Sequence, residues 1–447
     1  MTSYWCEQAW LNDAVADRVR VSLDNEGTIQ HVEAGVEPAR GDEALAGMVL
    51  PGFANAHSHA FHRALRGRTH ASDSAGTGRA ESTFWLWRER MYELAARLDP
   101  DAYLRLATAT YAEMARAGYS CVGEFHYLHH DADGTPYDPP NAMADVLREA
   151  ARRAGIRLTL IDACYLTGGI GEPLTGVQRR FGDGDADGWA ARVDDLALDP
   201  NTRIGVAAHS VRAVPADQLA TVAHAARDRP LHMHLSEQPG ENTACLSHYG
   251  RSPTTLLAEH GLLGPSSTAV HATHLRPDDV RVLGESGTTA CFCPTTERDL
   301  GDGIGPASAL AEAGSPLALG SDQHAVIDPF EDARAVEMNE RLASGQRGRF
   351  SPAQLVTAAT AAGHASLGWP EAGRIRVGAP CDLVGISTHT VRTAGATAEQ
   401  VMFAATAADI HTVVVNGRPV VAQGCHVLGD VGRLLTEAIE PLWGELR

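Results

Sequence analysis

The stretch from Leu50 to His59, LPGFANAHSH, places an apolar run directly before two histidines that stand two residues apart. Its apolar part belongs to the first of eight short apolar runs that recur between about residues 46 and 327. These are GMVLPGFANAH (47–57), YSCVGEFH (119–126), IRLTLIDACY (156–165), RIGVAAH (203–209), PLHMHL (230–235), TAVHATH (268–274), TTACFCP (288–294) and SPLALGSD (315–322). Segments with the apolar spacing of amphipathic helices separate the runs. This alternation predicts strands joined by helices.

The helical segments support a parallel arrangement of the strands. Residues 102–118 and 142–155 repeat apolar positions every three or four residues, and each ends in a glycine just past the last turn. Strands that alternate with helices form a parallel sheet with right-handed crossovers. Eight such units are what a (β/α)8 TIM barrel requires. An open doubly wound sheet is the alternative, but no Gly-rich phosphate loop follows an early strand. We therefore predict an α/β fold with the barrel over residues 50–370.

The two ends of the chain have a different pattern. Residues 1–49 (RVRVSLDNEGTIQHVEAG) and 371–447 (GRIRVGAPCDLVGIS, IHTVVVNGRPVVAQGCHVL) contain short alternating runs punctuated by Asn-Gly and Gly-Arg-Pro turns. Such runs are typical of β-hairpins. We expect the two ends to pair with each other in a small β-sandwich domain.

Composition excludes several classes of protein. The 447 residues carry a formal net charge of −19, which argues against a general nucleic-acid or anionic-membrane surface. No run approaches the ~18 apolar residues of a membrane span, and the first residues do not resemble an export signal, so we expect a cytoplasmic protein. The eight cysteines are scattered without a CxxC pair, as ordinary buried thiols are. The sequence contains no lysine, which excludes a Schiff-base, P-loop or carbamylated lysine.

Titratable side chains gather at the carboxyl ends of the expected strands, where a TIM barrel has its active site. A single histidine in an apolar run is ordinarily a packed core residue. Several histidines at different strand ends, with an aspartate at the last one, instead favour a metal site. In strand order these side chains are His57, His59, Glu124, His126, Tyr127, His209, Arg212, His232, His234, Glu237, His271 and Asp322.

Strand periodicity narrows the set of metal ligands. Residues two apart on a strand point to the same side, so His57 and His59 can bind one cation together. His232 and His234 also share a side, and periodicity alone does not choose between them. Glu237 lies just past the end of that strand, within reach of a group bound to the metal. That position favours His234 as the ligand and leaves His232 as a packed, hydrogen-bonded residue.

Asp322 follows LALGS at the end of the last strand and is the expected final ligand or metal-linked base. Three neutral imidazoles and a carboxylate suit Zn²⁺, with a water completing an open catalytic site. Iron or manganese would also accept these ligand types. A second metal would need a bridging anionic ligand, and no lysine is present to form a carbamate. The prediction is therefore one metal ion per subunit.

These residues and motifs carry a family resemblance. HxH after the first strand, His234-x-x-Glu237, His271 and the aspartate of GSD resemble the metal-dependent amidohydrolase superfamily, in its mononuclear deaminase branch. GRIRVGAPCDLVGI resembles the small β-domain of that superfamily. HSHAFHRAL, FWLWRERMY, GEFHYLHH, HSVRAV, HLSEQ, CPTTERDLGDGI and GSDQHAVIDPFEDAR resemble, more narrowly, the formimidoylglutamate deiminase (N-formimino-L-glutamate iminohydrolase) family of histidine degradation. The resemblance covers most of the chain.

The resemblance implies hydrolysis of N-formimidoyl-L-glutamate to N-formyl-L-glutamate and ammonia, by attack of metal-bound hydroxide on the amidine carbon. It implies as zinc ligands His57, His59, His234 and Asp322. It gives Glu237 the transfer of a proton to the departing ammonia. His271 would hydrogen-bond the attacking water or the tetrahedral intermediate. The family also suggests a homodimer that acts on a small molecule and binds neither nucleic acid nor membrane.

The resemblance also implies a substrate-binding set, made of His62, Arg88, Tyr127, His209 and Arg212. A glutamyl substrate brings two carboxylates, and the guanidinium fork of arginine binds a carboxylate in two places at once. We expect Arg88 to lie in a loop that folds over the barrel mouth, and Trp85 and Trp87 to serve packing. The remaining histidine of the opening segment, His70, is expected to be solvated.

Two positions depart from the family pattern. His62 stands where the family has glutamine in HSHAFQ, and Gln323 stands where it often has serine. A histidine still forms hydrogen bonds, but its ring offers fewer of them than the amide of a glutamine, and it can carry a charge. These departures leave the reaction type unchanged and bear on the identity of the substrate.

Other functions remain open at this stage. The nearest alternative is a deaminase acting on another acidic amidine or guanidine, or on an aminated heterocycle. A neutral base would leave Arg88 and Arg212 unmatched, which favours a dicarboxylate. A hydrolase of a ring amide would release no ammonia. A non-catalytic metal-binding or scaffold protein would not need the proton-transfer and arginine positions.

Overall fold

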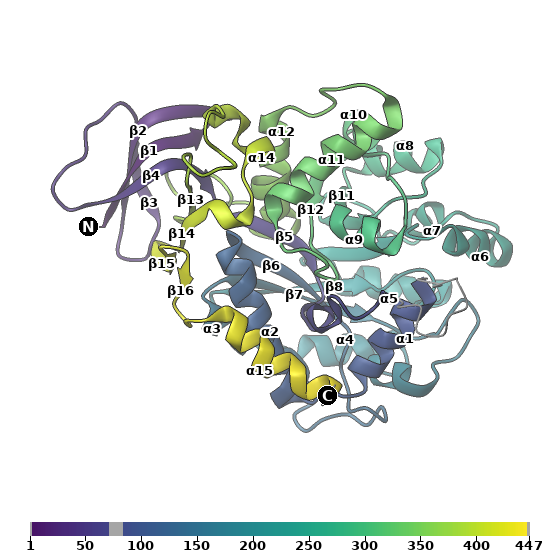
Figure 1. The fold of residues 1–447 in the computed structure, drawn as a ribbon. Coiled ribbons are helices and arrows are strands. Elements are labelled where there is room, and N and C mark those ends of the chain that lie inside the picture. Colours follow the sequence, from purple (N-terminus) through teal and green to yellow (C-terminus); the bar gives the residue numbers. More distant parts are fainter. Residues whose placement is uncertain (1, 71–83, 445–447) are drawn as a thin grey trace, which may run out of the picture.

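The computed structural model describes residues 2–70 and 84–444, and Figure 1 traces the chain. Eight parallel strands pair in sequential order to form the inner sheet. They are β5 (Phe53–Ser58), β6 (Tyr119–His126), β7 (Arg157–Cys164), β8 (Thr202–Ala208), β9 (Leu231–Leu235), β10 (Ser267–His271), β11 (Thr289–Phe292) and β12 (Leu317–Leu319). Each coincides with one of the eight apolar runs, extending at most one residue beyond it, because the strands of a barrel are covered on both sides. The predicted TIM barrel is confirmed.

Helices surround this sheet. Those that follow the early strands are α1 (Phe84–Ala95), α2 (Pro100–Arg116), α3 (Ala142–Ala154), α4 (Ala186–Asp194) and α5 (Leu219–Ala225). Those that follow the later strands are α6 (Pro239–Tyr249), α7 (Pro253–Glu259), α8 (Pro277–Ser286), α9 (Pro294–Leu300), α10 (Ala307–Ala313), α11 (Pro329–Ser344), α12 (Pro352–Thr357) and α13 (Gly363–Ser366). Helix α3 ends where the sequence predicts, because Gly155 adopts φ +76° and caps it.

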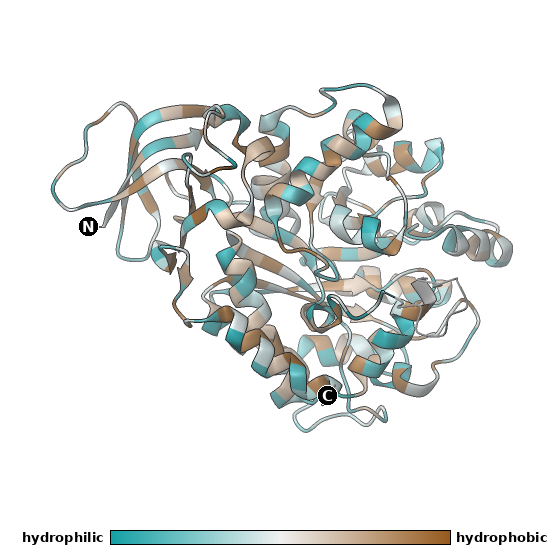
Figure 2. Ribbon diagram, viewed as in Figure 1, coloured by the Kyte–Doolittle hydropathy of each residue, from teal (hydrophilic) through white to brown (hydrophobic). Residues whose placement is uncertain are grey.

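One large apolar core joins the strands to the helices around them. Tyr103, Leu106 and Tyr111 of α2 are buried in it with Leu158 and Ile161 of β7. Figure 2 shows apolar residues along the central strands and mixed polar and apolar residues around α2, as expected for a helix that buries one face. The core makes the barrel a rigid support for the side chains at the strand ends.

The chain ends form the small β domain that the sequence predicts. Four strands from each end join in one mixed sheet of order β16-β15-β14-β13-β4-β1-β2-β3. Their bounds are β1 Ser3–Leu11, β2 Ala14–Leu23, β3 Ile29–Glu33, β4 Asp42–Pro51, β13 Leu383–Ile386, β14 Ile410–Val415, β15 Arg418–Ala422 and β16 Cys425–His426. Strand β4 pairs with both β1 and β13, so it links the two ends of the chain. Tyr4, Val19 and Leu383 belong to the separate apolar core of this domain.

The last part of the chain differs from the β-hairpins that we predicted for residues 371–447. Two helices occur there, α14 (Val401–Ala404) and α15 (Val431–Trp443). Helix α15 lies along α2 on the outside of the barrel (Figure 1). Its buried residues, Val431, Leu435, Ala438 and Leu442, follow helical spacing, and the side chain of Asp430 caps its first turn. This helical repeat follows directly on the alternating strands.

Two sequence expectations concern the chain as a whole. Within residues 2–70 and 84–444, no helix combines the length and apolar character needed to cross a membrane. All eight cysteines are free thiols, and seven of them are buried, with only Cys425 exposed.

Candidate active site

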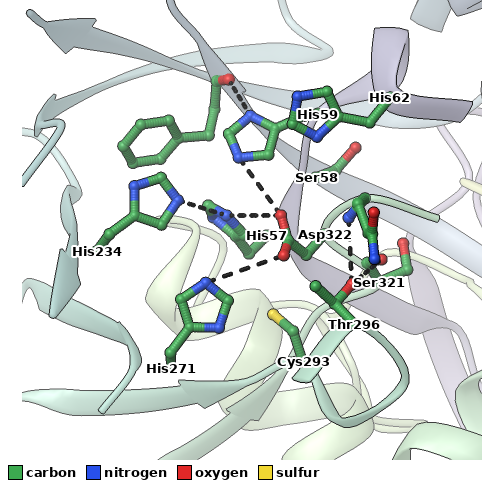
Figure 3. Close-up of polar contacts among 12 residues, drawn as sticks. His57, Ser58, His59, His62, His234, His271, Cys293, Thr296, Ser321 and Asp322 are labelled. Atoms are coloured by element: carbon green, nitrogen blue, oxygen red, sulfur yellow. Dashed lines mark hydrogen bonds and ion pairs between the residues drawn. The ribbon is translucent and has the colours of Figure 1, made fainter. Parts of the chain in front are cut away.

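Four side chains meet at the carboxyl ends of strands β5, β9 and β12 (Figure 3). His57 is on β5, His59 follows that strand, His234 is on β9, and Asp322 lies three residues beyond β12. His57 Nε2 lies 3.1 Å from His234 Nε2, and Asp322 Oδ1 lies 3.5 Å from His57 Nε2 and 3.4 Å from His59 Nε2. We call His57, His59, His234 and Asp322 the cage. The structure thus brings together all four predicted metal ligands.

The cage residues also close the barrel. The backbone N–H of Asp322 donates to the carbonyl of His57 at 3.0 Å, and the N–H of His59 donates to the carbonyl of Asp322 at 3.1 Å. Gly320 permits this approach, since a Cβ there would lie 2.8 Å from the Cβ of His57. Asp322 itself adopts φ +44°, in the left-handed region. The first and last strands therefore hold the ligand side chains in a fixed relation to each other.

The protonation of the cage suits a divalent cation. Burial lowers the pKa of His57 to about 3, and it lowers the pKa values of His59 and His234 as well. Burial opposes ionisation of Asp322, but the hydrogen bond and charge of His57 outweigh it and lower the pKa of that carboxyl. Neutral imidazoles and an ionised carboxylate are the states in which these groups bind metal.

Backbone carbonyls orient two of the imidazoles. Nδ1 of His59 lies 2.9 Å from the carbonyl of Phe125, and Nδ1 of His234 lies 2.9 Å from the carbonyl of His209. Each Nδ1 therefore carries the proton and donates it, which leaves the Nε2 lone pair directed into the cage. His57 Nε2 lies 3.1 Å from His234 Nε2, and the ligand atoms of these two histidines and of His59 lie within 4.8 Å of one another, so one cation can contact all three rings. The residues present fit a bound metal ion.

Glu237 and His271 lie beside the cage. His271 ends β10 with φ +68°, and its Nε2 lies 3.9 Å from Asp322 Oδ2 and 3.9 Å from Glu237 Oε1. Its Nδ1 lies 3.4 Å from Glu297 Oε1. Although burial disfavours the charged ring, Glu297, Glu237 and Asp322 raise the pKa of His271 to about 10. The site thus holds a proton donor and a carboxylate next to the metal ligands.

The cage opens into a cavity of about 670 Å³. Glu237, His271 and Asp322 line one end of it, with His59 and His234. The five predicted substrate-binding residues line it too, namely His62, Arg88, Tyr127, His209 and Arg212. Arg212 follows β8, and its Nη2 donates to Glu237 Oε2 at 3.2 Å. Sequence reasoning therefore located the residues that surround one cavity.

His62 lies between the cage and the aromatic wall of the cavity. It is buried, and its Nε2 lies 3.0 Å from the hydroxyl of Tyr127. Its ring centroid lies 4.6 Å from that of His59 and 5.2 Å from that of Trp87. Burial, as the largest cause, and the neighbouring His59 keep its pKa well below the ordinary value. His62 is therefore a neutral hydrogen-bonding group.

Two other residues of the N-terminal half differ from expectation in part. Arg88 lies on helix α1, where we predicted a loop over the mouth. Its Nε donates to the hydroxyl of Tyr92 at 2.7 Å and its Nη2 to the carbonyl of Gly168 at 3.3 Å. His70 is exposed, as expected, but its Nε2 lies 3.0 Å from Asp299. The side chain of Trp85 lies outside the described residues.

Three more buried polar residues lie near the site: Glu124, which the sequence places at a strand end without a role, Glu241, which the sequence does not indicate, and His232, which is expected to be packed and hydrogen-bonded. Glu124 accepts hydrogen bonds from Ser58 Oγ and from the N–H of Ala60, and burial raises its pKa to about 8. Glu124 thereby holds the turn that follows the cage histidines of β5. Glu241 lies 3.0 Å from Arg212. His232, the alternative ligand, instead lies 3.1 Å from the carbonyl of Ser366.

A second group, His126, His129 and Asp162, also offers three ligand atoms within 4.8 Å of one another. Arg192 donates to both oxygens of Asp162 at 2.9 Å, and Trp189 Nε1 donates to one of them at 2.9 Å. The carboxylate is thus already neutralised and hydrogen-bonded. None of the three residues lines the cavity. This group is a buried polar network.

Comparisons with known proteins agree with this geometry. The sequence profile of the amidohydrolase family matches residues 48–420. A formimidoylglutamate deiminase of Pseudomonas aeruginosa is 36% identical over 442 residues, which cover 95% of this chain and 96% of that protein. The crystal structure of an amidohydrolase from Brucella melitensis is 33% identical, with a TM-score of 0.91, and covers 99% of this chain and 100% of that one.

A more distant structure shares the fold. A zinc-bound adenosine deaminase from Xanthomonas campestris has a TM-score of 0.81 at 23% identity, covering 98% of this chain and 96% of that one. The family profile spans most of the chain, including every residue of the cage and of the cavity wall named above. The chain therefore belongs to the amidohydrolase family and is a metal-dependent hydrolase that acts on C–N bonds.

Proposed function

We propose that this hydrolase converts N-formimidoyl-L-glutamate and water to N-formyl-L-glutamate and ammonia. The observation that carries the proposal is the pair of guanidinium groups, from Arg88 and Arg212, in the same cavity as the cage. A substrate with two carboxylates matches two arginines that line one cavity, whereas a neutral heterocycle would bring no carboxylate to either of them. The likeness to the Pseudomonas aeruginosa enzyme supports the same substrate.

The positions of the two arginines suggest how the substrate lies. Arg212 contacts Glu237, next to the cage, while Arg88 contacts Tyr92 and Gly168 farther along the wall. The formimidoyl nitrogen is attached to Cα, so the α-carboxylate is the one nearer to the reacting carbon. Arg212 is thus suited to the α-carboxylate and Arg88 to the side-chain carboxylate. His62, Tyr127 and His209 would complete the walls around the chain of the substrate.

The charge of the site fits the other end of the substrate. A formimidoyl group is an amidine, which is cationic near neutral pH, and Glu237, Glu297 and Asp322 supply negative charge at this end of the cavity. Zn²⁺ is the metal we propose for the cage, with iron and manganese as alternatives. When bound, such an ion lowers the pKa of water to roughly 7 and so supplies the nucleophile.

The residues around the cage account for the proton transfers. The oxygen of water bonds to the amidine carbon, and the bond from that carbon to the terminal nitrogen breaks. Asp322 is placed to take the proton that the water loses. Glu237 starts as a carboxylate, so it is placed to take the second proton of the water oxygen and to deliver it to the terminal nitrogen, which then leaves as ammonia. His271 can donate a hydrogen bond from Nε2 to the oxygen of the tetrahedral intermediate.

The departure at His62 suggests a test of substrate identity. Imidazole offers fewer hydrogen bonds than the amide of the family glutamine, so another acidic amidine or guanidine is the second candidate substrate. Ammonia release should be measured with purified protein on N-formimidoyl-L-glutamate, on guanidino acids and on nucleobases. We expect N-formimidoyl-L-glutamate to give the highest kcat/KM. The proposal is wrong if this compound is inert while another substrate releases ammonia.

A further inference from the structure

We propose that Glu241 is a specificity-determining positioning residue, which holds the guanidinium of Arg212 so that its open edge can bind the substrate carboxylate. This inference rests on the proposed function, because it concerns how one carboxylate of that substrate is recognised. Glu241 is in the first turn of α6. It is near the reaction centre without being one of the groups that transfer protons.

The first observation is the burial of an anionic side chain beside Arg212. The side chain of Glu241 is fully buried, while that of Arg212 is 27% exposed and lines the cavity. Glu241 Oε2 lies 3.0 Å from Arg212 Nε as an ion pair. The two atoms are not aligned as a hydrogen bond, since neither has a hydrogen-bond partner of its own. Glu241, which lines the same cavity, therefore attracts the guanidinium at Nε and leaves Nη1 open to a ligand.

The second observation concerns Glu237, the other carboxylate beside Arg212. Glu237 accepts one hydrogen bond, from Nη2 of Arg212 at 3.2 Å. Within the described part of the chain, Nη1 of Arg212 donates no hydrogen bond. If Glu241 were absent, Glu237 would be the only anion beside Arg212 and would draw the fork onto itself. Because Glu241 shares the guanidinium with Glu237, Glu237 remains able to transfer a proton, and one edge of Arg212 remains open to a ligand.

The third observation is that the same carboxylate holds the turn that carries Glu237. Glu241 Oε1 accepts the backbone N–H of Ser236 at 2.9 Å. Ser236 adopts φ +50°, a conformation that a non-glycine residue keeps only when its surroundings support it. One buried side chain thus fixes both the turn that presents Glu237 and the position of Arg212.

The neighbouring Asn242 supplies a matched control. It accepts a hydrogen bond from Ser236 Oγ at 2.8 Å and donates to the carbonyl of His274 at 2.6 Å. It therefore holds the same turn through Ser236 and His274 and not through Arg212. We expect Asn242→Ala to loosen only the turn. Glu241→Gln also removes the negative charge beside Nε of Arg212. Glutamine keeps an oxygen that can accept the N–H of Ser236.

The experiment compares two substrates in both variants. N-formimidoyl-L-glutamate has both carboxylates, while N-formimidoyl-4-aminobutyrate lacks the α-carboxylate that Arg212 is proposed to bind. In Glu241→Gln we expect KM for the first compound to rise roughly tenfold or more, with a smaller change in kcat. KM for the second should change by less than about twofold, because that compound does not use Arg212. Asn242→Ala should affect both substrates equally.

Three further measurements make the result decisive. The metal content and Tm of Glu241→Gln show whether it remains folded and loaded. In an Arg212→Ala background, Glu241→Gln should cause no additional loss for N-formimidoyl-L-glutamate, since the two changes act through one interaction. An equal rise in KM for both substrates, or no rise for either, would refute the positioning role of Glu241 and leave the proposed function standing. A wild-type protein that is inactive on N-formimidoyl-L-glutamate would instead refute the proposed function, and the positioning role with it.

Discussion

Two groups of the barrel each contain two histidines and one aspartate, and all of these side chains are buried. His57, His59 and Asp322 belong to the cage, while His126, His129 and Asp162 form the network at the ends of β6 and β7. The difference lies in what neutralises the carboxylate. Among the described residues, the ion-pair partners of Asp322 are imidazoles, whereas Asp162 is bound on both oxygens by Arg192.

That difference separates a metal site from a structural one. A carboxylate that already accepts two hydrogen bonds from a guanidinium has little to offer a cation, and the arginine charge repels one. The cage also borders the cavity, so that a water and a substrate can reach it. Counting ligand types within a radius does not distinguish the two groups. The two groups differ in the residue that pairs with the carboxylate and in whether the cavity reaches them.

Asp322→Ala is expected to have the largest effect. The variant should lose at least about a thousandfold in deiminase activity, because it loses a metal ligand and the proposed base together. Metal content per subunit, measured by elemental analysis, should fall in parallel. Asp162→Asn is the control from the other group and should keep its full metal content. If Asp162→Asn lost the metal instead, the two groups would have been assigned the wrong way round.

Glu237→Gln should slow the reaction strongly without emptying the cage. Because the amide cannot transfer a proton, kcat should fall by about 10²–10⁴-fold. The metal content should stay at the wild-type level, since Glu237 is not one of the cage ligands. Steady-state ammonia release and metal analysis on the same sample test this. A variant with near wild-type kcat would rule out the proton-transfer role.

Asp162→Asn should show its effect in stability rather than in chemistry. The change leaves Arg192 buried beside an uncharged amide with Asp183 still paired to it, so the loss of the ion pair with Asp162 should cost at most about 3–5 kcal/mol. The free energy of unfolding, from a denaturant titration, should fall by that order. The kcat of the protein that remains folded should change little. A drop in kcat with unchanged stability would show that the network takes part in the reaction.

The pH dependence of stability gives a smaller and finer comparison. Burial opposes ionisation of Asp162, but Arg192 outweighs it and lowers the pKa from 3.8 to about 2. Because the pKa of Asp162 is lower in the folded protein than in the unfolded chain, its ionisation adds to the free energy of unfolding above about pH 4. This contribution is lost as the pH falls through 2. This contribution is about 2 kcal/mol. The difference in unfolding free energy between wild type and Asp162→Asn should therefore narrow between pH 4 and pH 2. A constant difference would contradict the assignment.

The barrel could be predicted because each of its strands has a recognisable pattern within a short stretch of sequence. Each strand is covered on both sides and reads as one short apolar run, and its last residues project into the site. Helix α15 was missed because its segment directly follows alternating strands, so we extended the strand pattern to the end of the chain. Arg88 was placed in a loop because its segment is rich in aromatic residues and has no clear amphipathic spacing.

The supporting residues of the site were harder to predict, because their roles depend on partners far away in the sequence. Glu241 matters through Arg212, and its buried position is visible only once α6 is packed against the barrel. The network around Asp162 has the ligand types of a metal site, and only the folded structure shows that Arg192, which lies 30 positions later in the chain, neutralises the carboxylate. Ligand types and strand periodicity locate candidate ligands, and the structure then shows which carboxylates are already paired.

We propose that the cage holds one metal ion per subunit and that the enzyme hydrolyses an amidine that carries two carboxylates. The most direct test of this proposal is to remove the metal with a chelator, add back Zn²⁺ in steps, and follow ammonia release from N-formimidoyl-L-glutamate. We predict that activity rises linearly and reaches its maximum at one equivalent per subunit in wild type and in Asp162→Asn. Full activity in the metal-free protein, or no ammonia at any zinc level, would contradict the account.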